Sequence, residues 1–209
     1  EKPLFRLLAD REGLDADPIE ELLHSDDQSV AIECTRTLRA LDDVSSADGL
    51  IALLERTQHA GVLRSTVEAL ERITGERLGA NPRLWRAWHM ETVRWKDTEL
   101  PRIRQELETG QRQRVNRALL EIARQRAHRH GTGPIVIKAT RTKDVATLET
   151  AIAVLGQLAT RQTVLRLIQL LGHDDERVQR AAYRSLRFAT GRDLGGDADA
   201  WREEFITNR

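Results

Sequence analysis

Five arginines lie close together in the middle of the chain, in the stretch RQRVNRALLEIARQR. They are Arg112, Arg114, Arg117, Arg124 and Arg126. Guanidinium groups fit phosphate oxygens well, so such an arginine ridge could follow a nucleic acid backbone. Val115, Leu119 and Ile122 recur at helical spacing, so one side of the predicted helix, residues 112–129, faces a core. The alternative, which we favour, is a solvated ridge whose arginines pair with neighbouring acids.

Two tryptophans could also contact a partner. On a helix that begins at Pro82 and runs to about Trp95, the indoles of Trp85, Trp88 and Trp95 fall on one stripe. Trp88 and Trp95 could form an aromatic shelf for a partner peptide or a base. We favour the simpler interpretation, in which both pack against the connector that follows, around Leu100.

The sequence shows no pattern typical of catalysis or cofactor binding. Six histidines are scattered, and His128 and His130 diverge because side chains two positions apart on a helix point in different directions. The single cysteine, Cys34, lies on an apolar helix face, which indicates a buried thiol rather than a nucleophile. Nucleophile-elbow, phosphate-loop and dinucleotide motifs are missing. We predict a protein that is not an enzyme and holds no metal or cofactor.

Composition narrows the class of protein further. The 209 residues include 40% hydrophobic side chains, enough for a real core, and 33 basic residues balance 33 acidic ones. Any electrostatic partner must therefore be attracted by a local patch. No apolar run is long enough for a membrane span, so we expect a soluble protein. The chain opens with glutamate rather than methionine, which suggests a piece of a longer protein and leaves its compartment undetermined.

The candidate residues must be positioned by amphipathic helices. In QSVAIECTRTLRAL, Val30, Cys34, Leu38 and Leu41 lie on one helical face. GVLRSTVEALERI and ERVQRAAYRSLRFA show the same spacing of valine and leucine, and leucine-rich segments such as TVLRLIQLLG lie between such helices. Leucine, alanine, arginine and glutamate favour helix over strand. The sequence therefore predicts an all-α fold.

One motif occurs twice, and it defines the domain organisation. Thr-Gly-x-x-Leu-Gly followed by tryptophan begins at Thr74 and again 116 residues later, at Thr190. Its glycines and tryptophans are Gly75, Gly79 and Trp85 in the first copy and Gly191, Gly195 and Trp201 in the second. Glycine at a helix end favours a left-handed cap, and an indole can fill the gap left by a long turn. We predict a structural role for these residues, in a first unit of residues 1–95, a connector with a short helix at 96–111, and a second unit of residues 112–209.

Helical hairpins with this valine and leucine spacing, acidic pairs at their junctions and leucine-rich second helices resemble HEAT and HEAT-like repeats. The resemblance covers nearly the whole chain. It implies a right-handed α-solenoid of about six hairpins, arranged as two copies of a three-hairpin unit. The repeated turn is similar to one in HEAT-repeat proteins of planctomycete-type bacteria. Scaffolding or binding follows from such a resemblance more readily than chemistry does.

Two functions remain open at this point. The first is a non-enzymatic scaffold that binds another protein, or other domains of its own longer chain, along the solenoid surface. The second is a HEAT-like nucleic-acid-binding protein that uses the arginine ridge, with Trp88 or Trp95 as aromatic contacts. The oligomeric state is not determined by the sequence.

Overall fold

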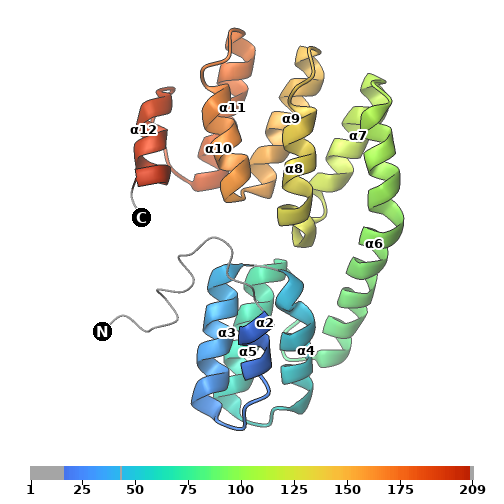
Figure 1. The fold of residues 1–209 in the computed structure, drawn as a ribbon, viewed down its shortest axis with the longest axis vertical. Helices are drawn as coiled ribbons and strands as arrows, with labels where there is room; N and C mark the ends of the chain where they lie inside the picture. Colours follow the sequence, from blue (N-terminus) through green and yellow to red (C-terminus); the bar gives the residue numbers. More distant parts are fainter. Residues whose placement is uncertain (1–16, 43, 208–209) are drawn as a thin grey trace. The chain divides into compact units, whose positions relative to one another are not determined.

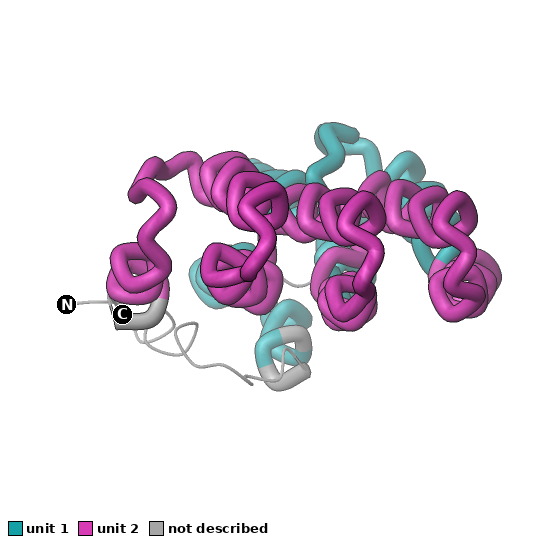
Figure 2. The backbone as a smooth tube through the Cα atoms, turned by 90° about the horizontal axis from the view of Figure 1, so that it is seen from above, with its two compact units in different colours: residues 1–95 teal, residues 96–209 magenta. Residues whose placement is uncertain are grey.

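The structure, a computed structural model, describes residues 17–42 and 44–207 (Figure 1). The beginning of the predicted first unit, residues 1–16, lies outside the described residues. The chain divides into two compact units, unit 1 with residues 1–95 and unit 2 with residues 96–209 (Figure 2). Every regular element in the described residues is helical, which confirms the predicted all-α class of stacked hairpins.

The described part of unit 1 contains two helical hairpins and the first half of a longer helix. Its elements are α2 (Asp17–Leu22), α3 (Gln28–Leu41), the short 3-10 turn η1 (Val44–Ser46), α4 (Ala47–Arg56), α5 (Ala60–Thr74) and the start of α6 (Pro82–Glu108). Helix α2 packs on α3, α4 packs on α5, and α3 lies beside α5. Leu38, Leu50, Leu70 and Ile73 are fully buried between them. Each helix thus buries its leucine-rich stripe against its neighbours.

Unit 2 contains the second half of α6 and a longer stack. Its further elements are α7 (Arg112–Ala123), the 3-10 turn η2 (Arg126–His128), α8 (Arg129–Ala139), α9 (Val145–Leu158), α10 (Arg161–Leu170), α11 (Glu176–Thr190), α12 (Ala198–Arg202) and the π-type turn η3 (Glu203–Thr207). Helices α7, α9 and α11 pack side by side in one row, and α8, α10 and α12 in a second (Figure 2). A two-row stack of this kind leaves the outer face of each row available to a partner.

Short polar side chains start most of these helices. Asp27, Asp144 and Asp175 each accept a hydrogen bond from a backbone N–H in the first turn of α3, α9 and α11. Thr160 and Thr163 form a reciprocal capping box at the start of α10. Each cap stabilises its helix by about 1 kcal/mol. The acidic junctions seen in the sequence are therefore helix starts.

The repeated turn has the same geometry in both units. Its four glycines have left-handed backbones, with φ of 82° at Gly75, 60° at Gly79, 69° at Gly191 and 72° at Gly195. The indole N–H of Trp85 donates to the carbonyl oxygen of Gly79 at 2.7 Å, and that of Trp201 to Gly195 at 2.8 Å. Both indoles are fully buried. Each tryptophan thus holds its own turn closed from inside the core.

Helix α6 differs from the predicted connector. The sequence predicted a helix ending near Trp95 and a separate short helix after it, whereas α6 continues through Pro101. That prediction was wrong: proline removes one backbone hydrogen bond and crowds the preceding turn, yet the helix continues past Pro101. Arg102 forms ion pairs with Glu99 and Glu106 along the same helix, and these pairs favour the turns on both sides of the proline.

The predicted single helix over residues 112–129 is also corrected. Helix α7 ends at Ala123, Arg124 follows it as the C-cap, and Arg126 begins the separate turn η2. No glycine or proline marks this end in the sequence. The helix ends where the chain turns inward, and the three residues after Arg126 are buried, namely Ala127, His128 and Arg129. The five ridge arginines therefore do not share one helix.

Candidate functional site

Two arginines of the predicted ridge are bound by acids of neighbouring helices. The guanidinium of Arg112 donates from Nε and Nη2 to the carboxylate of Asp144, at 2.9 and 2.6 Å. Hydrogen bonds from Thr147 and then from Arg112 lower the pKa of Asp144. Arg117 donates to Glu106 at 3.0 Å. The charge of these two arginines is thus already compensated within the protein.

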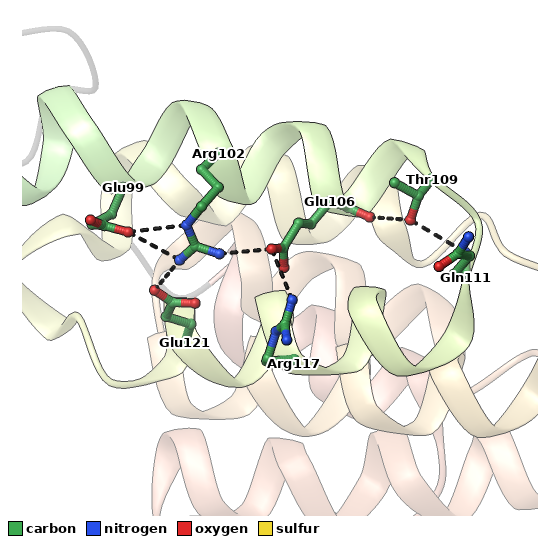
Figure 3. Close-up of polar contacts among 7 residues, drawn as sticks. All are labelled: Glu99, Arg102, Glu106, Thr109, Gln111, Arg117 and Glu121. Carbon is green, nitrogen blue, oxygen red and sulfur yellow. Dashed lines mark hydrogen bonds and ion pairs between the residues drawn. The ribbon is translucent and has the colours of Figure 1, made fainter.

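A third arginine, Arg102 of α6, joins α6 to α7 (Figure 3). It donates hydrogen bonds to Glu99 at 3.1 Å, to Glu106 at 2.8 Å and to Glu121 of α7 at 2.6 Å. The hydrogen bond with Glu121 raises the pKa of Arg102 despite some desolvation. Desolvation opposes ionisation of Glu106, but hydrogen bonds from Arg117 and Arg102 lower its pKa overall. In the cluster of Figure 3, the guanidinium groups of Arg102 and Arg117 are thus paired with carboxylates of the same chain rather than available to a ligand.

The rest of the ridge is exposed. Arg114, Arg124 and Arg126 lie on the surface, and within the described part of the chain none of the three forms an ion pair. They belong to the start of α7, to its C-cap and to the turn η2. The ridge is thus a mixture of paired and unpaired arginines on separate elements, and not one continuous basic line.

The two tryptophans proposed as contacts are largely inside the protein. Trp88 packs against the core of unit 1 and meets Trp85 edge to face, with ring centroids 6.0 Å apart. Trp95 exposes 9% of its surface. Burial of this extent leaves little ring face for a base or a peptide to stack on.

A groove lies between α9 and α11 on unit 2, and the sequence analysis had not singled it out. We define the α9–α11 groove by its lining residues, which are Glu149, Ala153, Gln157, Ala181, Arg184, Ser185 and Phe188. Its volume is about 250 Å³, and two adjoining hollows along α11 also include Arg184. Its floor is made of small side chains.

The floor is shallow because the two helices approach closely at Gly156. A β-carbon there would lie 2.9 Å from the β-carbon of Ser185 and 3.1 Å from its carbonyl oxygen. Ala153 and Ala181, one turn away on either helix, add little bulk. Close backbone approach over small residues fixes the width of the groove.

The charges along the groove are paired except at its centre. Arg177 donates to Glu149 at 2.7 Å and Arg180 pairs with Glu176 at 3.0 Å. Arg184, which lies between these pairs and the far end of α11, is exposed and has no ion pair among the described residues. A guanidinium that has no ion pair of its own can bind an anion.

An aromatic cluster lies beyond Arg184. Arg187 pairs with Asp193 at 3.2 Å and lies over the ring of Tyr183, with the guanidinium carbon 5.7 Å from the ring centroid. The Tyr183 hydroxyl donates to Asp193 at 2.5 Å, and this bond raises the pKa of Tyr183. Phe188 follows one turn after Arg184 and is 73% exposed. Phe188 is the most exposed large hydrophobic side chain among the described residues.

In unit 1, the position equivalent to the α9–α11 groove is closed by an ion pair between α3 and α5. With Leu38 aligned to Leu155 and Gly75 to Gly191, Arg39 of α3 corresponds to Gly156, and Glu68 of α5 corresponds to Arg184. Arg39 and Glu68 form an ion pair across the two helices, at 3.0 Å. Unit 2 has an open floor and an uncompensated arginine where unit 1 has a closed pair.

A family model for HEAT repeats matches residues 133–200. The matched segment contains α9, α10 and α11, which include both walls of the groove. The match supports a HEAT-like helical repeat protein. HEAT repeats generally mediate protein–protein interaction or scaffolding, and they are typically not catalytic. A comparison with curated proteins found no match to the chain.

The described part of this HEAT-like protein offers no group of three or more histidine, cysteine, aspartate or glutamate side chains that could hold a metal ion. Cys34 is fully buried, and desolvation raises the pKa of its thiol, which disfavours the reactive thiolate. Among the described helices, none combines the length and the apolar character that a membrane crossing needs.

Sequence reasoning could have found the groove from one signal in α11. Arg177, Arg180, Arg184 and Arg187 recur at spacings of three and four, and Phe188 falls on the same helical face. This spacing places an apolar ring beside a row of arginines on one exposed face. The sequence analysis considered only the valine and leucine stripe of this helix, which faces the core.

Proposed function

We propose that this HEAT-like protein is a non-enzymatic scaffold that holds a segment of another protein, or a neighbouring part of its own longer chain, in the α9–α11 groove. The observation that carries the proposal is the pairing of an uncompensated Arg184 with an exposed Phe188 over a small-residue floor. Arginine and large aromatic side chains are typical of residues that dominate binding energy in protein interfaces.

The frame around the groove supports this function. Gly156 lets α9 approach Ser185 of α11 closely, and an ion pair between Arg177 and Glu149 joins the same two helices. A groove that is already ordered loses little conformational freedom when a partner binds.

Site-specific photo-crosslinking tests the proposal. A photoreactive amino acid replaces Gln157 in the groove, and the matched control carries it at Gln113, an exposed glutamine on α7. In an extract of the source cells, we expect discrete protein adducts at position 157 that disappear when Arg184 is changed to glutamate. Equal adducts at both positions, or none at position 157, would show that this groove does not bind a protein.

The alternative, nucleic acid binding by the arginine ridge, has weaker support. Arg112 and Arg117 are occupied by acids, which leaves Arg114, Arg124 and Arg126 on separate elements. Phosphate binding loses affinity steeply between about 50 and 200 mM salt. A titration with duplex and single-stranded DNA at both salt concentrations tests it, and no binding at the lower concentration would refute it.

A further inference from the structure

The α9–α11 groove has a charge that selects its partner. Helix α11 carries four arginines against one acid, Glu176, whereas the equivalent helix α5 carries two arginines and two glutamates. Glu149, the acid that lines the groove, is engaged with Arg177, and Asp193 of an adjoining hollow is engaged with Arg187. A basic partner would find no available carboxylate there, while an acidic partner would find Arg184.

The paired arginines also distinguish a peptide from a nucleic acid. A phosphate backbone would have to displace several internal acids to reach a continuous row of guanidinium groups along α11. One carboxylate needs only Arg184, with which it can form two parallel hydrogen bonds. Single-site charge recognition therefore fits this surface better than recognition of a chain of phosphates.

The apolar part of the groove sets the second requirement. Phe188 stands beside Ala153 and Ala181, and the exposed ring has apolar surface to bury. Burying apolar surface contributes about 25 cal/mol per Å², so an aliphatic or aromatic side chain laid against Phe188 would be stabilised there. A partner segment with charged side chains alone would leave the apolar surface of Phe188 exposed to water.

We infer that the α9–α11 groove binds a segment of a partner protein in which an apolar side chain lies next to one or two carboxylates, the carboxylate pairing with Arg184 and the apolar side chain covering Phe188 and the small-residue floor. This inference rests on the proposed function and specifies its partner. Unit 1 has no such opening, because Glu68, the equivalent of Arg184, pairs with Arg39, the equivalent of Gly156.

A selection from random peptides tests the inference without knowledge of the natural partner. A phage library of random peptides of about twelve residues is selected on the full chain, and enriched peptides are synthesised with a fluorescent label. Their dissociation constants are measured by fluorescence anisotropy for the native chain, for Arg184→Met, for Phe188→Ser and for the control Arg114→Met. Circular dichroism verifies that each variant is folded.

We expect enriched peptides to place aspartate or glutamate within two positions of leucine, isoleucine, phenylalanine or tryptophan. Arg184→Met and replacement of the peptide acid by its amide should each weaken binding about tenfold, which corresponds to about 1.4 kcal/mol. The two changes together should cost little more than either alone. Arg114→Met should leave the dissociation constant unchanged.

The inference is overturned if enriched peptides lack acids, if Arg184→Met leaves their affinity unchanged, or if no peptide is enriched. Where the crosslink at Gln157 captures a protein and the peptides lack acids, the proposed function stands and only the partner chemistry is wrong. Where labelled single-stranded DNA binds in an Arg184-dependent way and no protein is captured at Gln157, both are wrong.

Discussion

Replacing Gly156 with alanine should destabilise unit 2, even though alanine is the better helix former. Alanine within a helix is favoured over glycine by about 1 kcal/mol. The new methyl carbon, however, would lie 2.9 Å from the β-carbon of Ser185 and 3.1 Å from its carbonyl oxygen, closer than van der Waals contact allows. Overpacking of this kind costs about 1–3 kcal/mol. The net expectation is a loss of about 1 kcal/mol in the free energy of unfolding.

A matched control makes the sign of this change decisive. Gly131 lies in the first turn of α8, and a β-carbon there meets no atom within 4 Å. Gly131→Ala should therefore stabilise the protein by about 0.5–1 kcal/mol through the unfolded chain and the helix. Urea unfolding of the full chain, followed by circular dichroism, compares the two variants. Adding Ser185→Gly to Gly156→Ala should recover part of the loss.

The result that would refute this reasoning is a stabilised Gly156→Ala protein. In that case α9 and α11 would have room for a methyl group at their contact. The shallow floor of the α9–α11 groove would then not be fixed by glycine, and the argument for a groove that is ordered before binding would fail with it.

Further predictions concern the turn, the ion-pair cluster and the groove. Trp201→Phe removes the hydrogen bond to Gly195 and leaves a small cavity, so it should cost about 2 kcal/mol of unfolding free energy in urea melts. Glu106 has a lowered pKa, so its contribution to stability is present above its ordinary pKa of 4.5 and is lost as the pH falls through its lower folded value. Glu106→Gln should therefore flatten the pH dependence of stability measured by urea melts below about pH 4.5. Gln157→Glu places a carboxylate on the same hollow as Arg184, and it should weaken acidic peptides several-fold in anisotropy titrations while leaving neutral peptides unchanged.

Helix type and the repeated turn were predictable because each depends on local sequence. The stripe of Val30, Cys34 and Leu38 determines which face of α3 is buried whatever helix lies beside it. The ends of helices were less predictable. Pro101 favoured a break that the neighbouring turns of α6 override, and α7 ends at Ala123 without any residue that stops a helix.

The candidate site was the part that sequence could not supply, because a free arginine and a paired one look alike in a sequence. Arg112 and Arg184 both lie on amphipathic helices with exposed basic faces. Asp144, which neutralises Arg112, is 32 residues away and reaches it only because α7 packs against α9. Arg184 lines the α9–α11 groove and has no such partner among the described residues. Which arginine can meet a ligand is therefore decided by helix packing rather than by composition.

The duplication itself explains where function could arise in this fold. The turn-forming positions are the same in both units, as Trp85 and Trp201 show by donating to equivalent glycines, Gly79 and Gly195. Those positions keep each unit folded, so they cannot differ without loss of stability. The surface between neighbouring helices carries no such constraint. There the pair Arg39 and Glu68 of unit 1 corresponds to Gly156 and Arg184 of unit 2, an exchange that opens a groove and frees a charge while the frame below it stays unchanged.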